Sequence, residues 1–295
     1  MTSLRTLLFA PANHPRRVEK SFTLHADAVI LDLEDACAIS EKVPSRVKVV
    51  EAMLRPRSCL GYVRVNPLST EFAYGDLSTV IRPGLDGVIL PKVESPGDLI
   101  TADWLIGQLE REHDLPAGSV DLIPIIETGL GVAQLEAILK APCCHGRRVK
   151  RVAFGAGDFT LDMGLTWNAD EAELMMYRAA IVLASRACGL EPPIDTVWVD
   201  LQNADGFKAS AARARHLGFQ GKLCIYPDQV AIVNAEFTPS EADVRRAHRI
   251  IDAFAEAEAQ GSSSIQLDGQ FIDYPIVYRA QRLLALVANL NSAAS

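Results

Sequence analysis

AVILDLED (residues 28–35) is a short apolar run that stops at a cluster of carboxylates. The chain repeats this pattern in YVRVN (62–66), GVILPKVE (87–94), DLIPIIET (121–128), RVAFGAGD (151–158) and TVWVD (196–200). A strand buried on both faces reads as continuous Val, Ile and Leu, and a charge at its end must be paired or ligated to leave water. The repetition therefore predicts parallel strands whose carboxyl ends share one polar site, as in an enzyme.

Two further strands complete the series, RTLLFAP (5–11) and GKLCIYP (221–227). Segments with helical periodicity separate the strands, at 15–26, 43–54, 75–82, 96–112, 129–140, 170–189 and 204–218. Most strands begin about 30 residues after the previous one, as expected of βαβ units. This series favours an α/β fold of the closed (β/α)8 TIM barrel type over an open doubly wound sheet. No GxGxxG follows the first strand.

The barrel accounts for residues 1–237, and residues 238–295 form an extension that barrel closure does not need. The pattern predicts a long helix (239–260), a Ser/Gly-rich segment leading into a hairpin or lid (261–275) and a closing helix (275–290). We expect this extension either to cover its own active site or to reach a neighbouring subunit.

The composition is that of an ordinary globular protein, with 49% apolar and 22% charged residues. A net charge of −8 argues against general nucleic-acid binding, which needs a basic surface. The N-terminal apolar run is too short for a signal peptide, and no stretch approaches the roughly 18 uninterrupted apolar residues of a membrane span. We therefore expect a soluble cytoplasmic protein that binds neither nucleic acid nor membrane.

Cysteine and basic residues give weaker signals. The cysteines are scattered, and Cys143-Cys144-His145 fits no zinc spacing, so we expect structural roles for them. Two basic clusters could hold an anionic ligand. We favour the first, because it directly follows a strand: Arg16, Arg17 and Lys20. We expect the second to be a solvated loop: Arg147, Arg148, Lys150 and Arg151.

Catalytic groups of a (β/α)8 barrel sit at the carboxyl ends of its strands. The residues expected there are Asp32, Glu34, Asp35, Arg64, Lys92, Glu94, Glu127 and Asp158. So dense a group of acids needs cations, because like charges at close range raise one another's pKa. Oxygen ligands favour Mg²⁺, with Mn²⁺ as a second candidate. Glu127 and Asp158 are the best ligand pair, since small neighbours admit a ligand; alternatively, such acids only cap the following helices.

Arg64 lies between valines in a strand, where a charge is costly to bury without an anion. Its planar guanidinium suits a carboxylate or enolate oxygen pair held in bidentate fashion. The alternative role is a salt bridge to Glu34 or Glu94 that only closes the barrel. A metal ion together with Arg64 would stabilise a developing enolate, because preorganised positive charge supplies much of the rate gain in such reactions.

Eight motifs in this order resemble the HpcH/HpaI aldolase and citrate lyase β-subunit superfamily, and more narrowly its CoA-ester lyase branch. They are PANHPRRVEK, ILDLEDA…EK…SR, YVRVN, LPKVES, IIET, FGAGDF, CIYPDQ and GQFIDYPIV, between about residues 4 and 288. The resemblance implies a Mg²⁺-binding (β/α)8 barrel that cleaves or forms a C–C bond in a 3-hydroxyacyl-CoA thioester such as citryl-, malyl-, methylmalyl- or citramalyl-CoA. The products would be a 2-oxoacid and an acyl-CoA. It also implies a homo-oligomer, a trimer or a hexamer.

The resemblance also assigns roles position by position. Glu127 and Asp158 match the metal-binding carboxylates, and Arg64 matches the arginine that holds the substrate carboxylate or enolate. Glu34 and Asp35 match acids that reach the metal through water. Lys92 has no such match, and from its place at a strand end we expect a supporting role for it beside them. Arg17 and Lys20 match the start of the CoA-facing loop, and Pro227 lies in the matching loop after the last strand. Asp273 matches a lid aspartate that enters an adjacent subunit's active site as a general acid/base.

Two positions depart from the family pattern. Many relatives have a second acid before the metal-binding Asp, where this chain has Gly157, and many have His where it has Tyr226. Both changes lie near the expected ligand site and bear on the choice of acyl-CoA. Two other functions stay open: a CoA-independent 2-oxoacid aldolase of the pyruvate type on the same barrel, and a CoA-thioester-binding or regulatory protein without turnover.

Overall fold

The computed structural model describes residues 4–144 and 148–294. These residues form two compact units, a barrel unit from Leu4 to Ala235 and a C-terminal unit that begins at Glu236. In the described part of the chain, no helix is both long and apolar enough to cross a membrane.

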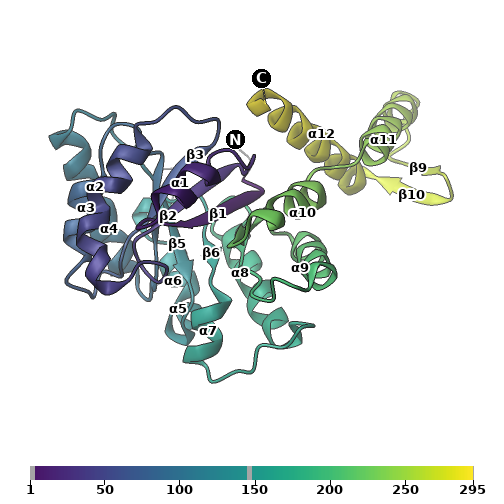
Figure 1. Ribbon diagram of the computed structural model, residues 1–295. Helices are drawn as coiled ribbons and strands as arrows, with labels where there is room; N and C mark the ends of the chain where they lie inside the picture. The colour runs from purple at the N-terminus through teal and green to yellow at the C-terminus, as the bar shows by residue number, and fades with distance from the viewer. Residues whose placement is uncertain (1–3, 145–147, 295) are drawn as a thin grey trace. The chain divides into compact units, whose positions relative to one another are not determined.

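The barrel unit is a closed ring of parallel strands in chain order, with β8 pairing back to β1 (Figure 1). The strands are β1 Thr6–Pro11, β2 Ala28–Asp32, β3 Leu60–Arg64, β4 Gly87–Leu90, β5 Asp121–Ile126, β6 Ala153–Phe154, β7 Ile194–Asp195 and β8 Gly221–Cys224. This ring confirms the (β/α)8 fold predicted from the strand spacing.

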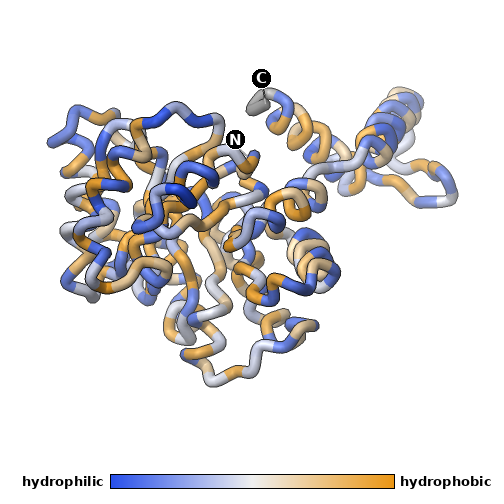
Figure 2. The backbone as a smooth tube through the Cα atoms, viewed as in Figure 1, coloured by the Kyte–Doolittle hydropathy of each residue, from blue (hydrophilic) through white to orange (hydrophobic). Residues whose placement is uncertain are grey.

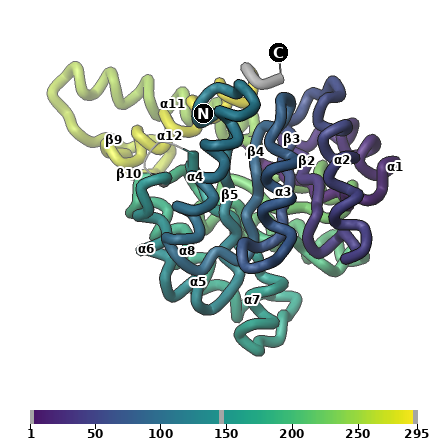
Figure 3. The backbone as a smooth tube through the Cα atoms, turned by 90° about the vertical axis from the view of Figure 1, so that its left-hand side faces the viewer, coloured from purple at the N-terminus to yellow at the C-terminus, as the bar shows by residue number. Residues whose placement is uncertain are grey.

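Helices follow the strands and cover the outside of the ring. They are α1 Pro15–Ser21, η1 Ile39–Glu41, α2 Lys42–Met53, α3 Ala73–Val80, α4 Pro96–Glu112, α5 Gly129–Ala133, α6 Leu135–Leu139, η2 Pro142–Cys144, α7 Ala156–Asp162, η3 Ala172–Leu174, α8 Met175–Ala187, α9 Ala204–Leu217 and α10 Pro227–Phe237. Figure 3 shows α2, α3 and α4 side by side, and α3 contacts both of its neighbours. In Figure 2 the helices alternate between hydrophilic and hydrophobic turns, as expected of elements with one face on the sheet.

Alternate strand residues fill the barrel interior. The buried cluster includes Leu7, Ala28, Ile30, Tyr62, Ile89, Ile123, Ile125, Ala153, Ile194 and Leu223. Because side chains alternate between the two faces of a strand, the next inward positions on β2 and β3 after Ile30 and Tyr62 are Asp32 and Arg64. The apolar interior therefore gives way to charged side chains at the carboxyl ends of these strands.

Some boundaries differ from the sequence prediction. The predicted strand 196–200 is wrong: β7 is the two-residue segment Ile194–Asp195 that precedes it. The predicted helix 129–140 is divided at Gln134 into α5 and α6. The predicted strands at 151–158 and 221–227 are too long, because only one or two residues lie between the ends of β6 and β8 and the starts of the helices α7 and α10.

The prediction of a solvated basic loop is also wrong for Arg148 and Arg151, while Arg147 and His145 lie outside the described residues. Arg148 is 5% exposed and binds both carboxylate oxygens of Glu110, at 2.6 and 2.8 Å. Arg151 is 3% exposed and its Nε donates to Glu191 at 2.7 Å. Each guanidinium is buried because a carboxylate from another part of the chain pairs with it.

The cysteines whose side chains are described are all free thiols: Cys37, Cys59, Cys143, Cys188 and Cys224. Burial raises the pKa of Cys224 to about 12. A buried thiol of this kind behaves as a small apolar side chain.

The C-terminal unit contains α11 Glu241–Ala259, the hairpin of β9 Ser264–Leu267 and β10 Gln270–Asp273, and α12 Tyr274–Ala294. A capping box begins α11, in which Ser240 and Asp243 bond each other's backbone N–H groups. Helix α11 packs against α12 and β9 around its own apolar cluster, which includes Ile250, Phe254 and Ile272. Asp273 ends β10, directly before α12.

Candidate active site

Asp32 and Arg64 form the best-defined pair at the carboxyl end of the barrel. They are register partners on the parallel strands β2 and β3. Arg64 donates from Nε to Asp32 Oδ1 at 2.7 Å and from Nη2 to Asp32 Oδ2 at 2.6 Å. Burial alone would lower the pKa of Arg64, but Asp32, together with Glu34 and Asp35, outweighs it and raises that pKa, so the guanidinium stays charged.

The expectation that Arg64 holds a ligand in bidentate fashion stays a prediction, and this pairing limits which edge of the guanidinium a ligand could use. Asp32 occupies the Nε–Nη2 edge of the guanidinium, and the Phe9 ring centre lies 4.7 Å from Arg64 Cζ. The Nη1 side lies toward Glu34 and Asp35. A guanidinium fixed on one edge and stacked on a ring is held in one orientation before any ligand binds.

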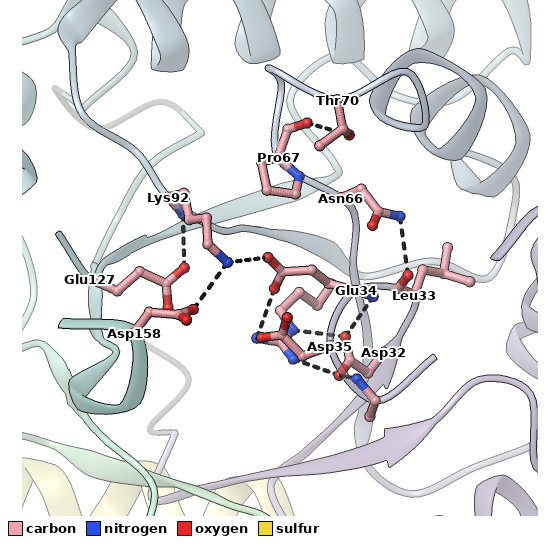
Figure 4. A network of polar contacts seen from close by, with 12 residues as sticks. Asp32, Leu33, Glu34, Asp35, Asn66, Pro67, Thr70, Lys92, Glu127 and Asp158 are labelled. Atoms are coloured by element: carbon pink, nitrogen blue, oxygen red, sulfur yellow. Dashed lines mark hydrogen bonds and ion pairs between the residues drawn. The ribbon is translucent and has the colours of Figure 1, made fainter. Parts of the chain in front are cut away.

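Glu34 links Arg64 to the other half of the site (Figure 4). Its Oε2 lies 2.9 Å from Arg64 Nη1, and its Oε1 accepts a hydrogen bond from Lys92 Nζ at 2.7 Å. Burial raises the pKa of Glu34 and outweighs the opposing effects of these two cations. Asp35 is exposed and lies farther from Arg64, 3.4 Å from Nη1. Glu34 is therefore the acid that connects the two cations.

Lys92 contacts three acids. Its Nζ lies 3.0 Å from Asp158 Oδ2 and its backbone N–H donates to Glu127 Oε1 at 2.8 Å, in addition to the bond with Glu34. The residue has a φ of 52°, in the left-handed region that is uncommon outside glycine. That backbone conformation directs the N–H and the side chain of one residue toward carboxylates from three strand ends.

Glu127 is deeply buried, at 3% exposure. Burial raises its pKa to about 8, and Glu34 and Asp158 add to the shift. A Cβ at Gly155 would clash with the Glu127 carboxylate, so only glycine at that position leaves room for it. A cation bound beside this carboxylate would stabilise its charged form.

Asp158 lies in the first turn of α7, directly after β6. The backbone N–H of Ala156 donates to the Thr196 hydroxyl at 2.8 Å, which ties the start of this helix to the segment after β7. Figure 4 shows Asp158 beside Glu127, on the opposite side of Lys92 from Glu34. The two carboxylates Glu127 and Asp158 thus lie together, and Lys92 and Glu34 connect them to Arg64.

Comparison with known proteins places the chain in a family. The sequence pattern of the HpcH/HpaI aldolase/citrate lyase family matches residues 5–227. The chain belongs to the HpcH/HpaI aldolase/citrate lyase family. The resemblance inferred from the motifs is thereby confirmed.

Similar members of the family have related names. Citrate lyase subunit beta from Haemophilus influenzae is 37% identical over 282 residues, covering 95% of each chain. Mitochondrial citramalyl-CoA lyase from Rattus norvegicus is 30% identical over 302 residues, covering 97% of this chain and 86% of the relative. The crystal structure of CitE from Mycobacterium tuberculosis, in complex with magnesium, acetoacetate and coenzyme A, has a TM-score of 0.78 at 28% identity, covering 97% and 98% of the two chains.

The family site fits a hard divalent cation. Glu127 and Asp158 offer carboxylate oxygens as donors, and the missing side chain at Gly155 leaves room for the carboxylate of Glu127. In the described part of the chain, no three His, Cys, Asp or Glu residues lie close enough together to hold an ion by themselves. Mg²⁺ commonly binds through one or two carboxylates and completes its octahedron with water and substrate oxygens. The donor set therefore suits Mg²⁺ better than zinc, which prefers nitrogen and sulfur.

Other positions singled out from the sequence lie outside the network. Arg17 and Lys20 are exposed on α1, and Pro227 begins α10. Glu94 is half-buried, and its described contact is a backbone bond to Asp98. Asp273 belongs to the C-terminal unit, where its Oδ1 accepts from the N–H of Ile276 at 3.4 Å.

The two departures from the family pattern have different surroundings. A Cβ at Gly157 would meet nothing within 4 Å, so the missing acid leaves open space next to Asp158. Tyr226 is 43% exposed and lines a hollow together with Trp198, Asp200 and Asp228.

Sequence reasoning missed the partner role of Asp32 and the contact of Phe9 with Arg64. Both could have been found from strand alternation, because Phe9, Asp32 and Arg64 are inward positions of neighbouring strands.

Proposed function

We propose that this protein is a Mg²⁺-dependent carbon–carbon lyase that cleaves, or forms, a 3-hydroxyacyl-CoA thioester. The observation that carries the proposal is the polar network in which Arg64, Glu34 and Lys92 connect to Glu127 and Asp158. Relatives named citrate lyase subunit beta and citramalyl-CoA lyase support the same reaction class.

Glu127 and Asp158 would hold the metal ion. Bound Mg²⁺ would act as a Lewis acid toward the oxygens of the 2-oxoacid half of the substrate. In the cleavage direction a base would remove the proton of the 3-hydroxyl, a carbonyl would form at that carbon, and the C–C bond would break. The bonding electrons then pass to the acyl-CoA half as a thioester enolate.

Arg64 would hold the developing negative charge through its Nη1 side, the part of the guanidinium that Asp32 leaves available. A donor oriented before the reaction stabilises such charge without reorganisation. Glu34 Oε2 lies 2.9 Å from Nη1. When substrate binds, the Glu34 carboxylate would either move away from Nη1 or contact it together with the substrate. Protonation of the enolate carbon completes the reaction and gives the acyl-CoA.

Asp273 would supply that proton as a general acid, from a lid formed by the C-terminal unit. We further propose that the lid serves a neighbouring subunit of a homotrimer or hexamer. Its exposed neighbour Phe271 (64% exposed) supports a role in contact with another surface. Arg17, Lys20 and Pro227 would contact the CoA moiety, with Arg17 and Lys20 offering exposed positive charge to its phosphates.

A panel of malyl-, citramalyl-, methylmalyl- and citryl-CoA tests the function. We expect Mg²⁺-dependent release of a 2-oxoacid from at least one of them. Turnover of free 2-oxoacid aldols with no thioester activity would instead favour a CoA-independent aldolase. Tight binding of acetyl-CoA in a calorimeter, with no turnover of any substrate, would favour a CoA-binding regulatory protein.

A further inference from the structure

Lys42, the first residue of α2, buries its ammonium group behind the acidic end of β2. The residue is 8% exposed. Its Nζ donates to the carbonyl oxygens of Leu33 at 2.9 Å and Glu34 at 2.6 Å, and to Asn66 Oδ1 at 2.7 Å. An ammonium group has three donors, so all of them are used.

A buried chain of polar groups fixes Asn66 in turn. Asn66 Nδ2 donates to Leu33 O at 3.1 Å, as Figure 4 shows, and to Asp76 Oδ2 at 2.6 Å. The other oxygen of Asp76 accepts from Arg46 Nε at 2.7 Å. Asn66 and Asp76 are 2% and 0% exposed, so the residues that hold the acceptor of Lys42 in place are shielded from solvent.

The ammonium of Lys42 has no carboxylate at ion-pair distance among the described contacts of the chain. Burying a charge without a counter-ion is costly, and a neutral donor would satisfy a single carbonyl at lower cost. What Lys42 adds is a single group that binds two consecutive backbone carbonyls, those of Leu33 and Glu34, and also the side chain of Asn66. The Glu34 side chain leaves this segment on the way to Arg64 and Lys92.

We propose that Lys42 is a positioning residue for the site. Its ammonium group holds the backbone of Leu33 and Glu34 so that the Glu34 carboxylate lies between Arg64 and Lys92, which in turn orients both cations toward the metal-binding acids. The expected loss of turnover rests on the proposed lyase function. The expected displacement of the Glu34 carboxylate rests only on the contacts within the barrel unit.

The test replaces Lys42 with methionine, which keeps the length and loses every donor. Lys48→Met is the matched control, because Lys48 lies on the same helix and makes only a half-exposed pair with Glu41 at 3.3 Å. For Lys42→Met we expect 10- to 100-fold lower kcat or Mg²⁺ affinity, the range found for groups that orient metal ligands. The readings are taken far below the melting temperature, so that a stability loss alone cannot lower activity per folded site.

A crystal structure of the same variant gives a readout independent of turnover. We expect the Glu34 carboxylate to leave its contact with Arg64 Nη1, while Lys48→Met keeps it. If Lys42→Met does not fold, Lys42→Gln provides the same measurements, with a smaller loss because its amide can serve one carbonyl.

A folded Lys42 variant with wild-type kcat, wild-type Mg²⁺ affinity and Glu34 unmoved would overturn the inference. Absence of thioester turnover in the wild-type protein would overturn the proposed function instead, and the position of Glu34 in the variant would still decide the role of Lys42.

Discussion

Asp32 and Arg64 are register partners on β2 and β3 and make two hydrogen bonds of 2.7 and 2.6 Å at the carboxyl end of the barrel. The pair takes up one edge of the guanidinium and leaves Nη1 toward Glu34. Arg64 is thus held in one orientation by the protein itself.

Asp32→Asn tests this orientation. The amide lacks the charge that balances a buried Arg64, and breaking a buried pair costs about 3–5 kcal/mol. We expect the free energy of unfolding in urea to fall by that order and kcat to fall with it. Asp35→Asn is the control for stability, because Asp35 is exposed and exposed pairs contribute less than about 1 kcal/mol. Equal effects of the two substitutions would contradict the assignment.

Gly155→Ala tests the space that Glu127 needs. A methyl group there would clash with the Glu127 carboxylate and the Ile125 side chain, whereas at Gly157 it would meet nothing within 4 Å. We expect Gly155→Ala to weaken Mg²⁺ binding in calorimetry and to lower stability by about 1–3 kcal/mol, as overpacking does. Gly157→Ala should bind Mg²⁺ like the wild type; a loss in that variant, with Gly155→Ala intact, would refute the argument.

Asp273 can be tested by mixing inactive variants. Asp273→Ala and Arg64→Ala should each lose turnover, since each removes one proposed participant. If the lid serves a neighbouring subunit, a mixed oligomer contains some sites with both residues intact, and turnover should partly return. Failure to recover activity after demonstrated subunit exchange would mean that each lid serves its own barrel.

The lowered pKa of Asp195 predicts how the free energy of unfolding changes at acid pH. Burial alone would raise its pKa, but Lys222 and Arg178 reverse this and lower it below the ordinary value of 3.8. Because the folded-state pKa is depressed, its stabilisation is complete well above pH 3.8 and is lost as the pH falls through the folded-state value.

Urea unfolding at a series of pH values measures this contribution. Asp195→Asn should lower stability near pH 7 by about 3–5 kcal/mol, because it leaves the buried charges of Lys222 and Arg178 underpaired. It should also flatten the dependence on pH in the acid range. An unchanged acid slope in this variant would assign that slope to other carboxylates, such as Glu110, whose pKa is also lowered.

The strand ends could be predicted from sequence because parallel strands bring their carboxyl ends to one face. Glu127 and Asp158 each follow a continuous apolar run, and Arg64 lies between valines near the end of another. Contacts through Glu34 and Lys92 join the three residues in one network. The partner of each charge could not be predicted, since it depends on register and backbone conformation. The positive φ of Lys92 and the bidentate bond of Asp32 are examples.

Buried charges outside the site escaped prediction for a related reason. Arg148 and Arg151 stand in a stretch that is typical of a solvated loop, and the sequence around Lys42 does not mark it as buried. Their partners lie between 8 and 40 residues away, so local pattern carries no signal of the pairing. The short strand β7 was misplaced because the apolar residues after it are as strand-like as Ile194 itself.

The most direct test of the account measures 2-oxoacid release from the preferred thioester with and without Mg²⁺, in the wild type and in Glu127→Ala and Asp158→Ala. We predict turnover that EDTA abolishes in the wild type. Both variants should lack turnover and Mg²⁺ binding while keeping the circular dichroism of a folded barrel. Full turnover of both variants in EDTA would contradict the central claim that these two carboxylates hold the catalytic metal.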